Sequence, residues 1–470
     1  MTFHLRYITL QKVALVLFAL VTFQSCFVAK NYERPEIPET DTLYRTDNLP
    51  ADSVSMAQLS WKEVFTDPVL QQYIEKGLEN NIDVRVALQQ IRAAEAYAKQ
   101  GKAGYYPTVD LGTSYTYQKF SPSSGLGQIV SSIQQFELSS SLSWEADIWG
   151  KIRSTDRASQ ASYLQTVAAH QAIKTQLISD LASVYYQIVA IDEQTHITEQ
   201  TIKAREKRLE ASHALKESGD LTEVAIKQTE AQLYTAQALL VDLNLNARIL
   251  ENTFSILLGE SPTEIERNSF EAQEMLAELK TGVPYQLLSN RPDVIAAEQN
   301  FRQAFELTNV AKSNFYPALT IGATGGFQST DFQNFFDANS LFANILGGLT
   351  QPLFNGRKIK TQYEVSQAQQ EEALLRYKQS ILVASKEVSD ALYSYQASEK
   401  AKEIRTKEYE AYTLAKEYSA ELLTYGLANY LEVITAEENE LNSSLGLTDA
   451  RYNKVKSIID LYKALGGGWQ

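Results

Sequence analysis

The histidines are the first residues to consider for chemistry, because imidazole serves both as a general base and as a metal ligand. His170, His196 and His213 all fall in stretches whose composition predicts helices. None has a second His at the four-residue spacing that places two metal ligands on one face of a helix. Helix-surface histidines, without a metal or a catalytic partner, are therefore expected.

Two acidic pairs and one glycine run are the other candidates. Glu371-Glu372 and Glu437-Glu438 are adjacent in sequence, and adjacent helical residues do not face each other, so solvated helix charges are expected. The run Gly466-Gly467-Gly468 precedes neither a Lys nor a predicted helix, as a phosphate-binding loop would. The sequence thus predicts no catalytic, cofactor-binding or metal site, and a protein that is not an enzyme.

The single cysteine, Cys26, follows an apolar run from Val13 to Phe23 that has a weakly basic start. This pattern predicts a signal peptide over residues 1–25, because the run is too short to cross a bilayer as a helix. Cys26 is then expected to be acylated as the first residue of a lipoprotein. Ser25 fits that motif, whereas Phe23 and Gln24 depart from it. A buried, inert thiol is the alternative.

Charge and composition narrow the class of protein further. The net charge of −14 argues against nucleic acid as a partner, and the hydrophobic share of 44% is enough to build a core. Residues 26–60 contain Pro35, Pro38 and Pro50 among polar residues, which predicts an extended, unpacked tether.

The chain is an internal duplication, because landmarks recur at a shift of 207–210 residues. Lys102-Ala103-Gly104-Tyr105-Tyr106-Pro107 matches Lys312-Ser313-Asn314-Phe315-Tyr316-Pro317. Gly219 matches Gly426, and Leu258-Gly259 matches Leu465-Gly466. Matched Pro and Gly positions are not explained by shared helical composition alone.

The sequence of each repeat predicts a helix, two short strands and a long helical hairpin. The first repeat spans 61–260, with strands near 108–118 and 135–146 and a hairpin near 151–258. A linker covers 261–283, and the second repeat spans 284–470, with strands near 318–328 and 340–351 and a hairpin near 357–465. Gly219 and Gly426 are predicted to end the long helices and allow the chain to reverse. Apolar residues at heptad spacing predict side-by-side helix packing; in the first hairpin they are Ile173, Leu177, Leu181, Val184, Ile188 and Ile191.

The four short segments alternate apolar and polar residues, as transmembrane β-strands do. Phe136, Leu138, Leu142 and Trp144, for example, alternate with serines. An unpaired strand edge is not tolerated in hydrocarbon, and the smallest membrane barrels have about eight strands. Four strands per chain therefore predict a barrel shared among identical copies, with two, three or four copies allowed by geometry alone.

These features resemble the TolC-type outer-membrane efflux proteins, in particular their lipoprotein branch. The matching stretches extend through nearly all of the chain that follows the signal peptide, and they are Trp61–Pro68, Trp144–Gly150, Val283–Val294, Leu353–Gly356 and Leu461–Trp469.

The resemblance implies an α+β membrane protein that forms a homotrimer. A twelve-stranded outer-membrane β-barrel would be continuous with a long periplasmic α-helical barrel. The implied function is the exit duct of a tripartite efflux pump in a Gram-negative cell, lipid-anchored in the outer membrane and extending into the periplasm. The implied partners are a periplasmic adaptor, an inner-membrane transporter of the resistance-nodulation-division type and outer-membrane lipid, with no cofactor.

The resemblance also implies a gate near the hairpin ends. Glu432 occupies one acidic gate position, and Thr435 stands where the family commonly has Asp. Gly219 and Gly426 mark the expected adaptor contacts. Two alternatives remain at this point: a duct for protein secretion, and a periplasmic coiled-coil scaffold or adaptor without a barrel.

Overall fold

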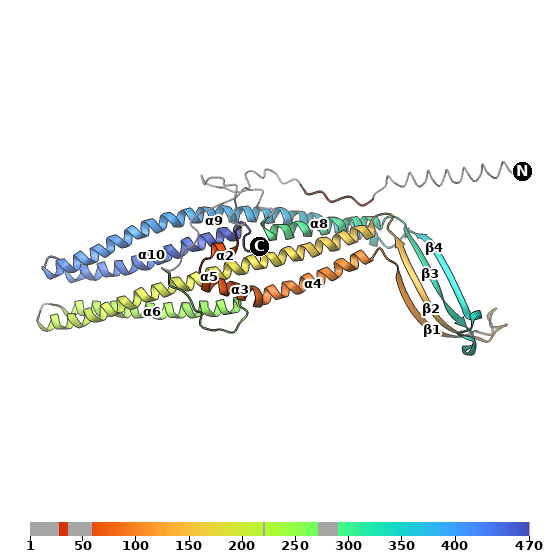
Figure 1. The fold of residues 1–470 in the computed structure, drawn as a ribbon, viewed down its shortest axis with the longest axis horizontal. Helices are drawn as coiled ribbons and strands as arrows, with labels where there is room; N and C mark the ends of the chain where they lie inside the picture. Colours follow the sequence, from red (N-terminus) through yellow and green to blue (C-terminus); the bar gives the residue numbers. More distant parts are fainter. Residues whose placement is uncertain (1–27, 36–58, 220, 271–289, 470) are drawn as a thin grey trace. The chain divides into compact units, whose positions relative to one another are not determined.

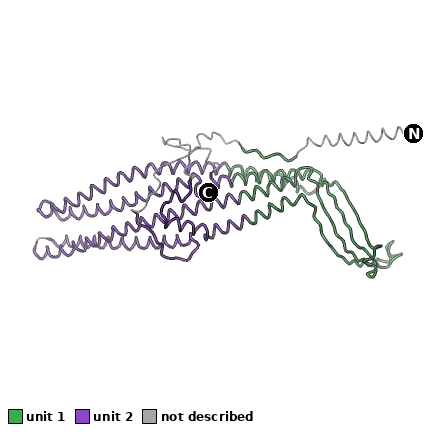
Figure 2. Tube along the Cα trace, in the orientation of Figure 1, with its two compact units in different colours: residues 1–36, 92–165, 297–377 green, residues 37–91, 166–296, 378–470 purple. Residues whose placement is uncertain are grey.

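The computed structural model describes residues 28–35, 59–219, 221–270 and 290–469. The chain divides into two compact units (Figure 2). Unit 1 comprises residues 1–36, 92–165 and 297–377, and unit 2 comprises residues 37–91, 166–296 and 378–470. The predicted signal peptide and Cys26 lie outside the described residues, as does part of the 261–283 linker.

Unit 1 contains a four-stranded antiparallel sheet in the order β1-β2-β3-β4 (Figure 1). The strands are β1 (Thr108–Lys119), β2 (Ser132–Ala146), β3 (Ala318–Ser329) and β4 (Leu341–Thr350). The first two come from the first repeat and the last two from the second. The central β2–β3 pair therefore joins the two halves of the duplication.

The register of the sheet aligns the alternation of apolar and polar residues in all four strands, so that apolar positions lie next to apolar positions. One row of paired residues runs across the strands as Val109, Leu142, Ala323 and Ile345. The neighbouring row, which points to the opposite face, runs as Asp110, Ser141, Thr324 and Asn344. Because successive residues of a strand point to opposite faces, one face of the sheet is apolar and the other polar.

The helices of the two repeats have matching lengths. In the first repeat, α4 (Ile82–Ala103) has 22 residues, α5 (Lys151–Glu217) has 67 and α6 (Glu223–Leu257) has 35. In the second, α8 (Pro292–Ser313) has 22, α9 (Lys358–Thr424) has 67 and α10 (Tyr430–Ala464) has 35. Among the residues described before α4, α2 (Trp61–Val64) and α3 (Pro68–Asn80) are helical. None of the helices in the described ranges is both long and apolar enough to cross a lipid bilayer.

The two hairpin turns have the same construction. Gly219 and Gly426 follow the long helices with φ of 89° and 72°, in the left-handed region that glycine adopts without strain. Three residues beyond each glycine stands a helix cap. Thr222 Oγ1 accepts from Ala225 N, and Asn429 Oδ1 accepts from Glu432 N. The caps satisfy backbone donors that the first turn of a helix leaves unpaired.

The C-terminal ends of α6 and α10, the second helices of the two hairpins, accept equivalent hydrogen bonds in unit 2. Asn81 Nδ2 donates to the carbonyl of Leu257 at 2.8 Å, and Arg291 Nη1 donates to that of Ala464 at 2.9 Å. Leu257 and Ala464 are 207 positions apart in sequence, which is the shift that relates the two repeats. The duplication is therefore present in the tertiary contacts as well as in the sequence.

The heptad interpretation of α5 is incomplete. No residue from 177 to 191 is exposed, so this part of the helix is surrounded and is not a two-sided coiled-coil strand. Its core contains a polar network at Asp67, whose carboxylate accepts hydrogen bonds from Tyr185 Oη at 2.6 Å and Asn268 Nδ2 at 2.9 Å. Burial raises the pKa of Tyr185 far above its usual range, so the phenol stays protonated and donates.

The prediction of an unpacked tether is wrong for residues 31–35. These residues form no helix or strand, but they lie on α8 within unit 1. The Tyr32 ring contacts Phe301 and Phe305 at centroid distances of 5.7 Å. Arg34 Nε donates to Glu298 at 2.9 Å. Proline content predicted an extended backbone here, but it carried no information on what Tyr32 and Arg34 would contact.

Candidate gate between the helical hairpins

The two hairpins of unit 2 contact each other near their glycine turns, and Tyr430 is central to that contact. Asn429 caps α10, so Tyr430 is the first residue of that helix. Its hydroxyl lies 2.7 Å from Ser212 Oγ on α5 and 3.0 Å from Thr229 Oγ1 on α6. One side chain of the second hairpin therefore bridges both helices of the first.

A pair of ionic contacts lies further along the same helices. Arg205 on α5 is only 3% exposed and donates to the Gln232 carbonyl at 2.5 Å and to Glu438 of α10 at 2.8 Å. Arg208 forms an ion pair with Glu437. Burial raises the pKa of Glu437 above its ordinary value, although Arg208, Lys416 and other nearby charges oppose that shift.

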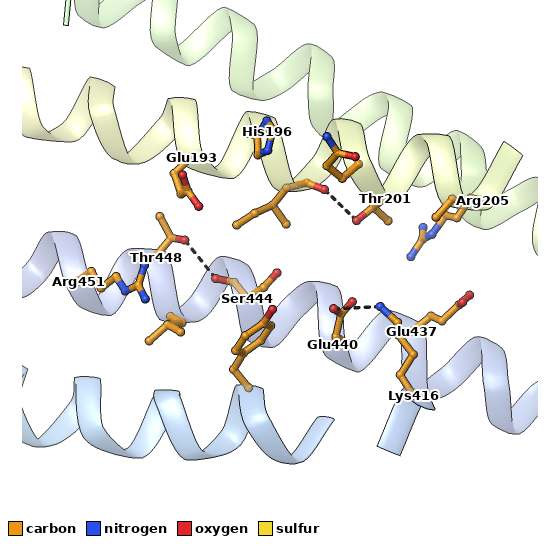
Figure 3. Close-up of a pocket in the computed structure, with 15 residues that line it drawn as sticks. Glu193, His196, Thr201, Arg205, Lys416, Glu437, Glu440, Ser444, Thr448 and Arg451 are labelled. Atoms are coloured by element: carbon orange, nitrogen blue, oxygen red, sulfur yellow. Dashed lines mark hydrogen bonds and ion pairs between the residues drawn. The ribbon is translucent and has the colours of Figure 1, made fainter. Parts of the chain in front are cut away.

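Arg205 and Glu437 line a pocket of about 410 Å³ between α5, α9 and α10 (Figure 3). Its wall mixes both signs of charge, and Lys416 of α9 donates to Glu440 of α10 across 3.1 Å. The charged lining residues are Glu193, Arg205, Lys416, Glu437, Glu440 and Arg451, and His196 and Tyr409 also line the pocket. Ion pairs in such a partly hydrated site hold helices together less firmly than a dry apolar seam would, since water can replace either partner.

Glu437 and Glu438 are not the solvated charges that their sequence predicts. Both form ion pairs with arginines of α5, and the Glu437 side chain is 14% exposed. Glu371 and Glu372 are exposed, and Glu372 pairs with Arg376 one helical turn away on the same helix. The difference arises because residues 437–438 face another helix.

The three histidines do not come together. His196 is exposed at the edge of the pocket, His213 is exposed, and His170 is partly buried. Burial and the neighbouring Lys174 lower the pKa of His170, which favours the neutral imidazole. Within the described ranges, no group of three or more His, Cys, Asp or Glu is placed to hold a metal ion.

The predicted gate residues lie on the α9–α10 hairpin. Glu432 and Thr435 are exposed and line a groove of about 430 Å³ together with Tyr412 and Ser419 of α9. The Glu432 carboxylate accepts a hydrogen bond from Asn429 Nδ2 at 2.8 Å. Glu432 therefore lies exposed beside the hairpin turn.

Sequence reasoning missed Tyr430, Arg205 and Arg208. A signal was available, because Arg205 and Arg208 lie three residues apart on one face of α5, as a double ionic contact requires. Their partners on α10 could not be identified without knowing which helix faces meet.

The comparisons with known proteins agree with this architecture. The family model described as "Outer membrane efflux protein" matches residues 73–260 and 283–467, so the chain belongs to this family of transport proteins. The solvent efflux pump outer membrane protein SrpC of Pseudomonas putida is 27% identical over 468 residues, covering 97% of this chain and 98% of the relative. The probable outer membrane lipoprotein SilC of Salmonella typhimurium is 25% identical over 449 residues, covering 94% and 95%.

The fold is that of the TolC-like outer-membrane channels, with mixed helix and strand. The outer membrane channel CmeC of Campylobacter jejuni superposes with a TM-score of 0.86 at 23% identity, covering 94% of this chain and 95% of that one.

Proposed function

We propose that this protein is the outer-membrane exit duct of a tripartite efflux pump, through which small molecules pass passively across periplasm and outer membrane. The observation that carries the proposal is the sheet. Its apolar face carries large exposed side chains, with Leu111 and Ile345 exposed by 77% and 78%. The in-phase register supports a lipid-facing side and a water-facing side.

The edges of the sheet support an assembly of several chains. Among the described strands, β1 pairs only with β2 and β4 only with β3. In hydrocarbon these edges require partners, and four strands fall short of the about eight in the smallest barrels. A homotrimer would supply twelve strands, in keeping with the TolC-like fold.

The test of this proposal is the oligomeric state of the mature, detergent-extracted protein. A trimer by light scattering that dissociates on heating in dodecyl sulfate supports the duct. A monomer that stays soluble in buffer without detergent would refute it and favour the coiled-coil scaffold. The relative named for solvent efflux supports small molecules over secreted proteins as cargo.

The contact between hairpins supports a gate. Opening would require α9 and α10 to move away from α5 and α6, which breaks the Tyr430 bridge and the Arg205–Glu438 ion pair. Three copies of Glu432 around a narrow passage would attract cations. Glu432→Gln should weaken cation preference in planar bilayers, and unchanged selectivity would count against this role.

Two contacts with other components complete the proposal. The turns at Gly219 and Gly426 are the proposed docking points for a periplasmic adaptor, which would link the duct to an inner-membrane transporter of the resistance-nodulation-division type. Cross-linking these turns to the adaptor tests the arrangement. Acylation of Cys26 is supported by the relative named as a lipoprotein. An intact mass without acyl chains on Cys26 would exclude the lipid anchor.

A further inference from the structure

The β3–β4 connection carries an unusual concentration of aromatic residues in unit 1. It includes two short 3₁₀ helices, η5 (Phe332–Asn334) and η6 (Ala338–Ser340). Phe335 is buried, whereas Phe332 and Phe336 are 64% and 67% exposed. Large apolar rings in water are unfavourable, so their exposure in a single chain calls for an apolar neighbour.

The connection is a folded element. Asp331 caps η5 by accepting from Gln333 N at 3.0 Å, and its backbone carbonyl accepts from Ser329 Oγ at 2.8 Å. At the other end, the buried Ser340 donates its hydroxyl to the Asn334 carbonyl at 2.7 Å. These bonds fix the direction in which the phenylalanines point.

The phenylalanines pack onto the apolar face of the sheet. Phe332 lies 5.3 Å from the ring of Phe136 on β2, and Phe336 lies 5.6 Å from that of Phe327 on β3. Phe335 contacts both strand residues at 6.4 Å. Phe136 and Phe327 share the face that carries Leu142 and Ile345. We call Phe332, Phe335 and Phe336 the aromatic plate.

The apolar neighbour of the plate could be lipid or a second copy of the chain, and the position of the plate distinguishes between them. Copies of the chain would join at the β1 and β4 edges, whereas the plate covers β2 and β3, the central strands. It therefore extends the lipid-facing surface, away from the seams between copies. At the opposite end of that face stands Trp144, eight residues from Phe136 along β2. At about 3.4 Å per residue and a tilt of about 40°, the two aromatic levels are about 20 Å apart, close to the apolar band of about 25 Å in outer-membrane barrels.

We propose that the aromatic plate is a lipid-binding surface that inserts into the outer interface of the outer membrane. The β3–β4 connection then contacts the bilayer and does not lie over the channel mouth. Aromatic side chains favour this boundary because their rings are apolar and polarisable. Asp331 and Asp337, which flank the plate and are exposed, would then lie at the level of the headgroups. The inference rests on the proposed function, since it requires a membrane-embedded sheet.

Spin-label accessibility tests the plate in the full-length mature trimer, reconstituted in phosphatidylcholine vesicles. A nitroxide is placed by Phe336→Cys, with Gln333→Cys as the matched control on the same connection. Gln333 is exposed and lies outside the plate. The label at 336 should collide several-fold more with oxygen, which concentrates in lipid, than with a water-soluble nickel chelate. The label at 333 should show the reverse.

Two results overturn the inference. Preference for the nickel chelate at 336 would place the plate in water over the mouth, and shielding from both quenchers would place it under a second copy. Leu142→Cys, in the middle of the apolar face, separates this outcome from failure of the proposed function, because its label must remain oxygen-accessible if the sheet is in lipid. Phe336→Trp, read by quenching with brominated phosphatidylcholine, repeats the test without a nitroxide. Quenching should exceed that of the unmodified protein, whose Trp144 lies on the same face of the sheet, and no increase would contradict the proposal.

Discussion

Replacing Arg205 by methionine should loosen the contact between the two helical hairpins. The substitution keeps most of the side-chain volume and removes the contact with Glu438 of the second hairpin, along with a hydrogen bond to the Gln232 carbonyl that lies within the first hairpin. Loss of one partner of a fully buried ion pair costs about 3–5 kcal/mol, because the remaining charge has no solvation. Glu438 is 35% exposed, so water can solvate it and the cost is lower.

We therefore expect about 2–3 kcal/mol, within the range for hydrogen bonds to charged groups. If the hairpins separate when the channel opens, this change multiplies the open-to-closed ratio about 30- to 150-fold. Single-channel recordings of purified protein in planar bilayers measure that ratio directly. Hydrogen exchange at the amides of residues 430–436 measures the same opening without a voltage.

Arg376→Met is the matched control, because it also removes one positive charge from a long helix. Arg376 is 68% exposed and pairs with Glu372 one turn away, an interaction worth about 0.3–0.5 kcal/mol. It should leave the open probability close to that of the unmodified protein. Equal open probability in Arg205→Met and Arg376→Met would refute the idea that the Arg205 contacts hold the gate closed.

Three further predictions follow from backbone geometry and burial. Gly466→Ala should lower the melting temperature strongly, since a Cβ would lie 2.5 Å from the Asn290 carbonyl oxygen. Gly426→Ala meets open space and should cost only about 1 kcal/mol of left-handed strain. A similar loss of stability in both variants would contradict this reasoning. Gly326→Ala places a Cβ 2.0 Å from the Leu138 carbonyl oxygen and should reduce the yield of heat-modifiable oligomer. Gly347→Ala, whose Cβ would have no neighbour within 4 Å, should leave that yield unchanged. Equal yields from the two variants would exclude a steric role for Gly326. Burial raises the pKa of Glu437, so its contribution to stability is present at low pH and is lost as pH rises through the raised pKa. Glu437→Gln should therefore be more stable than the unmodified protein at about pH 7 and equal to it at about pH 4, as read from thermal unfolding; a pH-independent difference would exclude this titration.

Several features of the fold could be predicted because they depend on short-range sequence patterns. Positive φ at Gly219 and Gly426 follows from the steric freedom of glycine at a helix end. The alternation in each strand follows from the two-residue period of an extended chain. The repeat was detectable because both halves need the same turns at the same spacing, as the equal helix lengths of 67 and 35 residues illustrate.

The partners of individual side chains were decided by the tertiary structure alone. The sequence identified Glu437 and Glu438 only as helix charges, and their pairing with Arg208 and Arg205 depends on the faces along which α5 and α10 meet. The same holds for Tyr32, whose packing on α8 overrides an extended, proline-rich segment. Local sequence determined where this chain turns and which side of each strand is apolar, because those properties depend on neighbouring residues. Contacts between residues more than 200 positions apart were decided by packing, because only the folded chain brings those surfaces together.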